Sequence, residues 1–454
     1  MNEKNAIIAI AAVAVIVLAS FCGFAMIKNN EGEKYEAKVT GNVPVLGNAN
    51  NDDYVDSHDI DTLREIINSG SWDRETYPFA DADRSGSIDE ADIEIVQKII
   101  DGERTPLYYK DIYGEFVKVS YPVKHERIGV SYWQQAEMAT LIGQWDKVVL
   151  ASQSTTSSNS HRYDVSNITK SFKGSSITTE LILECQCDFV IASQGKSSVV
   201  NAAVDAAKSE NGREITPYYV DVSKSASYVG AVLTLGVILN ENKAAQNYAK
   251  YVYDILDKIT EGMKKVDKKA DSVVTLMYAN QSTRANIIVE CEGTGAADMI
   301  GLISNVYDDA TKSTSDYRLN VEPDWFIQNS GKKFEYIIIQ QEGTDTKKVD
   351  DTYYTPKMYN DRFEEAITYY SSTSAYSQGK ILGTTFSYNS FGGYANLLYL
   401  AYLMYPDVFS EEDGWNALQI YFDNFTTAKI DVKTQGGWYY SGTAYAQYNQ
   451  RLSS

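Results

Sequence analysis

The sequence predicts an α/β fold in which two lobes, each with a mostly parallel sheet, are joined by one long helix. Residues 241–268 carry apolar side chains in steps of three or four, which places one apolar stripe along a helix face. At about 1.5 Å per residue this helix would be roughly 40 Å long, too long for one layer of a small domain. Strand-like and helix-like segments alternate on both sides of it, as in parallel sheets covered by helices. The stripe consists of Ala245, Tyr248, Val252, Ile255, Ile259 and Met263.

This alternation sets the expected boundaries of a bilobal part at 109–454. Lobe one is expected at 109–240, the connecting helix at 241–268 and lobe two at 269–454. In lobe one, the pattern predicts strand, loop, helix, turn and strand over 127–150, a helix running into a strand over 178–191, a strand at 216–222 and a helix at 227–240. In lobe two it predicts strands at 272–278, 285–289 and 334–340, and helices at 295–303, 322–329, 361–369 and 394–405.

Composition excludes several classes of partner. The formal net charge is −20, whereas a phosphate backbone requires a basic surface, so we expect no nucleic acid partner. The 35 tyrosines can line a wet cleft, although surface loops rich in tyrosine explain them equally well. Cys185 and Cys187 are too closely spaced for a usual zinc hook, and Cys187 and Cys291 are expected in different lobes. We therefore expect buried free thiols, with a disulfide between any two of the four cysteines as the alternative.

The amino terminus contains an apolar segment. Residues 6–27 carry no charge and are long enough to span about 30 Å of hydrocarbon as a helix. We expect residues 1–30 to be an uncleaved membrane anchor, with a cleaved signal segment as the alternative. Either interpretation places the rest of the chain outside the cytoplasm.

Two acidic loops, at 48–59 and 81–92, repeat at an offset of 33 residues. Each offers oxygen atoms at loop positions 1, 3, 5, 7, 9 and 12, which is the spacing of an EF-type calcium loop. The apolar positions of the helices that follow repeat at the same offset, so two calcium ions are expected. The expected ligands are Asn48, Asn50, Asp52, Tyr54 (through its carbonyl), Asp56 and Asp59, and Asp81, Asp83, Ser85, Ser87, Asp89 and Asp92.

The paired loops and helices resemble a type I dockerin, which implies a small all-α calcium module at 41–104. Both loops end in Asp where an ordinary EF-hand has Glu. Asp53 stands at loop position 6, where Gly is expected because the turn there favours positive φ. The resemblance implies a cohesin partner that contacts loop positions 10 and 11, here Ser57-His58 and Glu90-Ala91. The alternative is a calcium-rigidified spacer that packs on its own chain.

The remainder resembles the substrate-binding proteins of ABC importers for ferric siderophores, haem and corrinoids. The likeness rests on the strand–loop–helix segment 127–149, on the helix–strand segments 178–193 and 321–339, and on the long connector. It covers about 109–425, and Cys187, Phe334 and Glu335 depart from the family pattern. It implies an ABC permease as partner and an iron chelate, haem or corrinoid as ligand. By the same resemblance, Glu180 and Glu322 are the acidic residues expected to meet the permease.

In such sheets, ligands bind beyond the carboxyl ends of the strands. The side chains expected there are aromatic and neutral with one cation, which suits a large planar or chelate ligand. The expected ligand-binding residues are Ser131, Tyr132, Trp133, Ser193, Gln194, Arg284, Gln341, Tyr388 and Tyr394.

The sequence gives no sign of an enzyme. It has three histidines and contains neither a Gly-x-Ser-x-Gly elbow nor a His-Glu-x-x-His helix. The segment His161-Arg162-Tyr163 could touch a ligand, although a solvated loop is the simpler interpretation. The alternative function is a cell-surface assembly protein that docks through its dockerin-like module.

Overall fold

The computed structural model describes residues 43–158, 162–221, 225–277, 287–341, 367–384, 391–428 and 430–441, with the short pieces 348–349, 352–353, 361 and 363. The expected anchor or signal at 1–30 lies outside the described residues, as do Arg284 and Tyr388. Within the described part of the chain, no helix is both long and apolar enough to cross a membrane. The chain divides into two compact units, Met1–His125 with Val229–Tyr253, and Glu126–Tyr228 with Asp254–Ser454.

The first unit contains the two loop–helix repeats. Their helices are α2 (Ser57–Ser69) and α3 (Glu90–Ile100), and each begins at a capping box formed by Asp residues three positions apart. The apolar faces of the two helices pack on each other and on the loops. Their shared core consists of Ala49, Ile60, Leu63, Ile66, Ala80, Ala82 and Val96.

A β-hairpin and two further helices complete the first unit. Strands β1 (Thr105–Lys110) and β2 (Phe116–Tyr121) pair antiparallel. The Lys110 amide donates to the Pro44 carbonyl over 2.8 Å, which fastens the hairpin to the segment before the first loop. The helices are α7 (Tyr228–Leu239) and the first half of α8 (Asn242–Met263). The hairpin lies in the range expected for lobe one, but it groups with the repeats.

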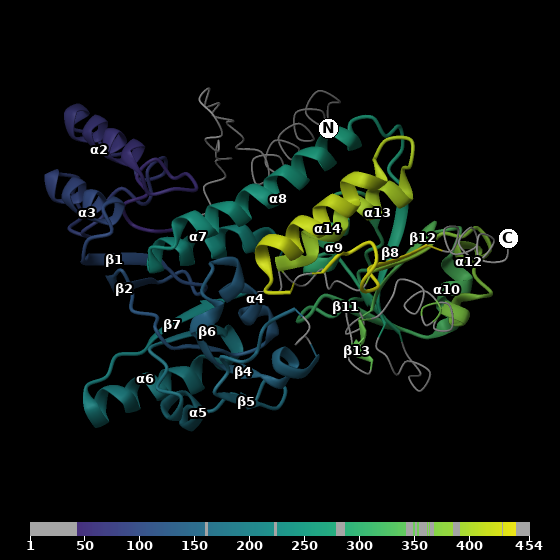
Figure 1. The fold of residues 1–454 in the computed structure, drawn as a ribbon. Coiled ribbons are helices and arrows are strands. Elements are labelled where there is room, and N and C mark those ends of the chain that lie inside the picture. Colours follow the sequence, from purple (N-terminus) through teal and green to yellow (C-terminus); the bar gives the residue numbers. More distant parts are fainter. Residues whose placement is uncertain are drawn as a thin grey trace. The chain divides into compact units, whose positions relative to one another are not determined.

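The long helix α8 agrees closely with the predicted connector (Figure 1). It follows the strands of the first lobe in the chain and precedes those of the second. Five of the six stripe residues are buried, and only Met263, the last residue of the helix, is half-exposed. The apolar stripe therefore identified both the helix and its buried face.

The first lobe contains a five-stranded sheet, all parallel, in the order β5-β4-β3-β6-β7. Helices α5 and α6 cover one face of it, sharing a core that includes Ile182, Val200 and Val190 (Figure 1). The strands are β3 (Ile128–Val130), β4 (Val148–Ser152), β5 (Lys170–Phe172), β6 (Phe189–Ser193) and β7 (Thr216–Val220). The helices are α4 (Trp133–Leu141), α5 (Thr179–Glu184) and α6 (Ser197–Asn211), with short turns η1 (Trp145–Lys147), η2 (Ser154–Ser158), η3 (Gln194–Lys196) and η4 (Ser225–Ser227).

The second lobe contains a mixed sheet in the order β11-β9-β8-β12-β15-β16, with β10 on β8. Strand β8 pairs parallel with β12 and β10, and β12 pairs parallel with β15. The pairs β8–β9, β9–β11 and β15–β16 are antiparallel. The prediction of mostly parallel sheets thus describes the first lobe better than the second, which contains antiparallel pairs. Antiparallel neighbours need no crossover helix between them.

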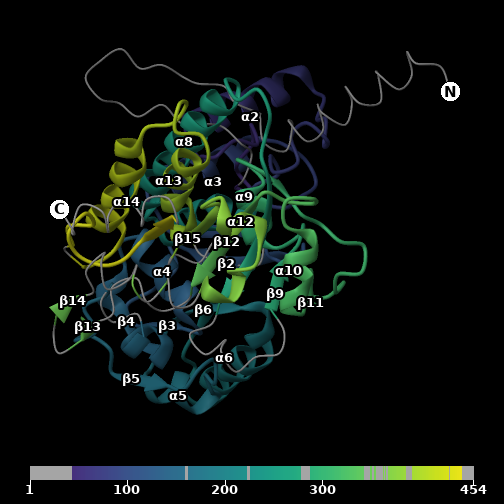
Figure 2. The ribbon, with the colours of Figure 1, turned by 90° about the vertical axis from the view of Figure 1, so that its right-hand side faces the viewer.

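Buried aromatic residues dominate the core of the second lobe, among them Phe326, Phe334 and Tyr370. Figure 2 shows α13 and α14 side by side, and a separate two-stranded sheet is formed by β13 and β14. The strands are β8 (Asp271–Met277), β9 (Ile287–Glu290), β10 (Asn305–Val306), β11 (Arg318–Val321), β12 (Tyr336–Gln341), β13 (Lys348–Val349), β14 (Thr352–Tyr353), β15 (Ile381–Thr384) and β16 (Tyr439–Ser441). The helices are α9 (Gly295–Ile300), α10 (Pro323–Asn329), α12 (Ser374–Ser377), α13 (Leu397–Met404) and α14 (Glu411–Phe425), with turns η6 (Thr368–Tyr370) and η7 (Phe391–Asn396).

Candidate functional site

The carboxyl edge of the first-lobe sheet brings together two of the predicted clusters. Strands β3 and β6 are neighbours in register, so the segments that follow them start side by side. The Ser193 amide donates to the Ser131 hydroxyl over 3.1 Å, which joins the two segments directly. Residues 131–133 and 193–194 therefore share one edge of the sheet.

The side chains at this edge differ in exposure. Ser131 is buried, and Trp133 is 7 % exposed at the start of α4. Tyr132 is half-buried at the N-cap of α4, with its ring centroid 6.3 Å from that of Trp133. Ser193 is half-buried and Gln194 is exposed. Gln194 is therefore the most accessible of these side chains, and Tyr132 and Ser193 are partly accessible.

The second-lobe residues are placed differently. Gln341 ends β12, at the carboxyl end of a central parallel strand, and its side chain is not among the described ones. Tyr394 is 5 % exposed in η7, and its hydroxyl donates to the Ser225 carbonyl over 3.1 Å. Tyr394 therefore ties η7 to η4, a segment that follows the first-lobe sheet. Its hydroxyl already has a protein partner.

A buried carboxylate that the sequence analysis did not single out lies beside this edge. Glu137 is fully buried on α4 and accepts hydrogen bonds from the amides of Phe391 (3.0 Å) and Gly392 (2.9 Å). The Tyr421 hydroxyl of α14 donates to the same carboxylate. Burial raises the pKa of Glu137, while the charge of Arg162 and these three donors act in the opposite direction. One side chain of the first lobe thus holds two elements of the second.

Arg162 lies next to this carboxylate and is 4 % exposed, so it belongs to the interior and not to a solvated loop. Its carbonyl accepts from the amides of Thr427 (3.1 Å) and Ala428 (3.2 Å), beyond the end of α14. The neighbouring Tyr163 stacks on Trp145 with centroids 4.6 Å apart. Two features of the sequence could have pointed to this buried pair: Glu137 is the single charged residue of the helix at 133–141, and Arg162 lies in a polar loop.

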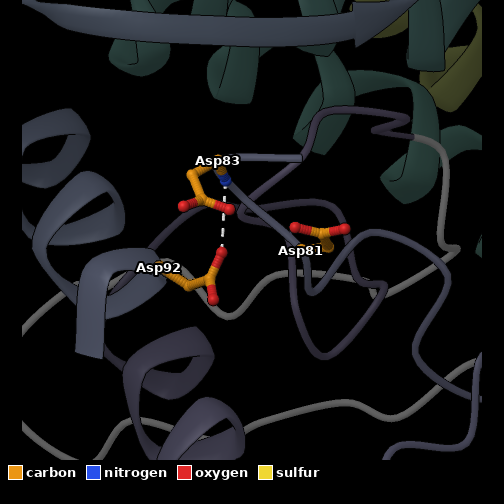
Figure 3. Close-up of side chains that lie close together, drawn as sticks. All are labelled: Asp81, Asp83 and Asp92. Atoms are coloured by element: carbon orange, nitrogen blue, oxygen red, sulfur yellow. Dashed lines mark hydrogen bonds between the residues drawn. The ribbon is translucent and has the colours of Figure 1, made fainter. Parts of the chain in front are cut away.

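The second acidic loop brings three carboxylates together (Figure 3). Ligand oxygens of Asp81, Asp83 and Asp92 all lie within 4.8 Å of one another. The Asp92 oxygens accept from the Asp83 amide (3.2 Å) and the Asp89 amide (2.9 Å), so its orientation is fixed by the loop itself. Burial raises the pKa of Asp81 and of Asp92, and the charge of Asp83 raises each further. A cation would relieve this repulsion, and an all-oxygen donor set suits calcium.

The remaining predicted ligands of the second loop lie in the same turn. The Ser85 amide donates to Asp81 (2.9 Å) and Asp83 (2.8 Å), which orients both carboxylates. The hydroxyls of Ser85 and Ser87 lie 3.1 Å apart. Asp89 caps α3 by accepting from the amide of Ala91.

The first loop repeats the main hydrogen bonds of the second. The Asp59 oxygens accept from the Asn50 amide (3.1 Å) and the Asp56 amide (2.7 Å), as Asp92 does in the second loop. The Tyr54 amide donates to Asp52 over 2.7 Å, matching Ser87 and Ser85. The side-chain oxygen Oδ1 of Asn48 accepts from the Asp52 amide over 3.1 Å.

The first loop carries fewer carboxylates than the second, because Asn48 and Asn50 stand where Asp81 and Asp83 do. Burial raises the pKa of Asp59 to about 8, against the lowering effect of its two backbone donors. Both loops therefore fit a calcium ion. Because Asp52 stands where Ser85 does, the ligand positions hold three carboxylates in the first loop and four in the second.

The backbone of the first loop corrects one expectation. Gly86 has φ +92° at position 6 of the second loop, but Asp53 at the same position of the first is not among the residues with positive φ. The left-handed residues shared by both loops are instead Asn51 (φ +56°) and Arg84 (φ +65°), at position 4. Asp53 therefore imposes no strain on the turn, and its presence needs another explanation.

The two acidic residues expected to face a permease are both exposed. Glu180 lies in the first turn of α5, where hydrogen bonds to the backbone and to Thr178 lower its pKa. Glu322 is the N-cap of α10, one position before the first turn, and its side chain makes no capping bond. Neither side chain is used to hold its own lobe together in the way that Glu137 is.

Comparison with known proteins identifies the family. Residues 128–361, more than half of the chain, match the family described as periplasmic binding protein. Residues 46–101 match the dockerin type I domain. No curated protein sequence matches the chain.

Solved structures share the fold at low sequence identity. The TroA-like periplasmic binding protein FepB of Veillonella parvula is 14% identical with a TM-score of 0.57, over 74% of this chain and 99% of that one. An ABC transporter solute binding protein of Sulfurospirillum deleyianum is 14% identical with a TM-score of 0.52, over 72% and 98%. Helicobacter pylori CeuE with Ni(II) bound is 17% identical with a TM-score of 0.50, over 72% and 98%.

The chain belongs to the periplasmic binding protein family, and a dockerin type I segment precedes its family region. Proteins of this family bind solutes and are not enzymes, so the expectation that the chain is not an enzyme is confirmed. Membership also implies a location outside the cytoplasm.

Proposed function

We propose that the chain is the substrate-binding component of an ABC importer, which captures an iron chelate, haem or corrinoid and delivers it to a permease. The observation that carries the proposal is the grouping of Tyr132, Ser193 and Gln194 at the carboxyl edge of the first-lobe sheet. Ligands of open α/β sheets bind at this edge, and aromatic and neutral polar groups suit a large planar or chelated solute. The likeness in fold to CeuE, whose structure has Ni(II) bound, supports a metal-containing solute.

Binding of defined probes tests this proposal. Haemin, cyanocobalamin and a ferric hydroxamate are titrated into the protein, and tryptophan fluorescence and calorimetry report binding. Tyr132→Ala should weaken binding of the accepted probe about ten- to hundredfold, because it removes an aromatic contact. Tyr113→Ala, which removes an exposed tyrosine from the hairpin turn, is the control. A parent protein that binds none of the probes contradicts the ligand class, and unchanged binding by Tyr132→Ala contradicts the site.

Two calcium ions, held at 48–59 and 81–92, form part of the proposed function. The support is the matched pattern of hydrogen bonds to Asp59 and Asp92. Asp81→Asn gives the second loop the neutral first ligand that the first loop already has, and should weaken that site alone. Calorimetry against calcium after chelator treatment measures this, with the exposed Asp61→Asn as control. No calcium uptake at millimolar concentration would reject both sites.

Docking to a permease through Glu180 and Glu322 is also proposed. Both are exposed at the start of a helix, one in each lobe, where a negative charge is also favoured by the helix dipole by about 0.3–1 kcal/mol. Uptake by reconstituted permease should fall in the Glu180→Gln, Glu322→Gln double variant while solute affinity stays unchanged, and exposed Glu214→Gln serves as control. Unchanged uptake in the double variant would reject docking through these residues, and their only role would then be the favourable interaction with the helix dipole.

A second candidate function is attachment to a cohesin-type partner at the cell surface. It is favoured by the dockerin match and by the exposure of Ser57, His58, Glu90 and Ala91, at loop positions 10 and 11. Calcium-dependent capture of a purified cohesin module by the full chain would support it, and no capture at micromolar concentration would oppose it. Anchoring through residues 6–27 is compatible with both functions.

A further inference from the structure

The Asp at position 6 of the first loop has a partner elsewhere in the unit. Asp53 is 2 % exposed, and its carboxylate accepts a hydrogen bond from the hydroxyl of Tyr253 on α8. Tyr253 is itself 5 % exposed. The loop thus contacts a helix 200 residues further along the chain, within the same compact unit.

Other contacts hold the repeats against the rest of this unit. The Tyr121 hydroxyl of the hairpin lies 2.7 Å from the Ile99 carbonyl oxygen, near the end of α3, and 3.0 Å from Asn240 Oδ1, between α7 and α8. A Cβ on Gly102 would lie 2.9 Å from Asn240 Nδ2, so the chain after α3 approaches this junction closely. The repeats therefore contact the junction of α7 and α8 at the carboxyl end of α3, and contact α8 itself at the first loop.

We propose that calcium binding at the first loop and docking of the repeats on α8 are one coupled equilibrium, linked through Asp53 and Tyr253. The inference rests on the proposed calcium sites. Asp53 directly follows Asp52, a predicted calcium ligand, so a cation that fixes the loop backbone also fixes the carboxylate that Tyr253 contacts. Asp replaces Gly at position 6 because the docked loop uses that side chain. The partner of the loop is thus the α8 helix of the same chain.

Coupling of this kind is reciprocal, so weakening the docked contact must weaken calcium binding by the same factor. Tyr253→Phe removes only the hydroxyl and keeps the buried ring. It should weaken the first calcium site about tenfold and leave the second unchanged. Thr234→Val is the matched control, because it also removes one buried hydroxyl from this unit, but one that donates to the Gly230 carbonyl within α7 and not between the repeats and α8.

Calorimetric calcium titration of the full chain gives the two affinities. Hydrogen exchange of the α8 amides around Tyr253 is the second readout: calcium should slow it in the parent and in Thr234→Val, and have a smaller effect in Tyr253→Phe. Equal first-site affinity in parent and Tyr253→Phe overturns the coupling while leaving the calcium sites intact. A parent that binds no calcium at the first loop overturns the sites and the coupling together. Circular dichroism of Tyr253→Phe confirms that the variant is folded when these values are compared.

Discussion

Glu137→Gln is the sharpest test of how the two lobes of the second unit are joined. The parent carboxylate only accepts: one oxygen takes the Phe391 amide, and the other takes the Gly392 amide and the Tyr421 hydroxyl. A glutamine of the same shape must turn its NH₂ toward one of these donors. The cheaper orientation abandons the Phe391 amide alone and leaves a buried N–H unsatisfied, which costs about 1–3 kcal/mol.

The assay is urea unfolding of the full chain, combined with hydrogen exchange of residues 391–396. The matched control is Glu290→Gln, which replaces another fully buried carboxylate, paired with Arg318 across two neighbouring strands of one sheet. Both variants should be destabilised, but only Glu137→Gln should speed exchange in η7. If Glu137→Gln unfolds at the same urea concentration as the parent, the carboxylate does not hold η7 and the reasoning fails.

Three further outcomes are expected. Burial raises the pKa of Cys187 to about 12, so its thiol should react with iodoacetamide at pH 8 only after unfolding; rapid native labelling would contradict this. Hydrogen bonds, of which that from the Tyr307 hydroxyl has the largest effect, lower the pKa of Asp309 to about 2. Asp309→Asn should therefore lower the free energy of unfolding by its full amount above pH 4, and this difference from the parent should vanish as the pH falls toward 2. Gly262→Ala should cost about 1–3 kcal/mol despite the higher helix propensity of alanine, because its Cβ would lie 2.3 Å from the Phe409 ring; unchanged thermal unfolding would show that Phe409 moves aside.

Periodicity and spacing predicted the parts of this protein whose signal is local. The apolar stripe of α8 and the twelve predicted calcium ligands are patterns within short stretches of sequence. The structure shows that the stripe is buried and that three of the predicted ligands, Asp81, Asp83 and Asp92, lie close together. The clusters at 131–133 and 193–194 could be paired because strand ends of one parallel sheet share an edge. In these cases the geometry follows from residues close together in the sequence or from neighbouring strands of one sheet.

The long-range partners could not be predicted in this way. Glu137 and Phe391 are 254 residues apart, and Asp53 and Tyr253 are 200 apart, so no repeat or spacing connects them. A charged residue within a buried helix and an acid at a glycine position were visible as anomalies, but the sequence did not name their partners. Burial of Tyr394 is of the same kind, since its hydroxyl contact with Ser225 depends on how distant segments pack.

The first unit is assembled from two separated stretches of chain, Met1–His125 and Val229–Tyr253. During synthesis the ribosome therefore produces the repeats and the hairpin before the helix residues that complete their packing. Until Asn240 and then Tyr253 have been synthesised, the nascent repeats lack the contacts that these residues make with Tyr121 and Asp53. For the same reason, a truncation that ends before residue 253 removes part of this unit together with the second lobe. The repeats expressed as an isolated domain would expose the surface that α7 and α8 cover.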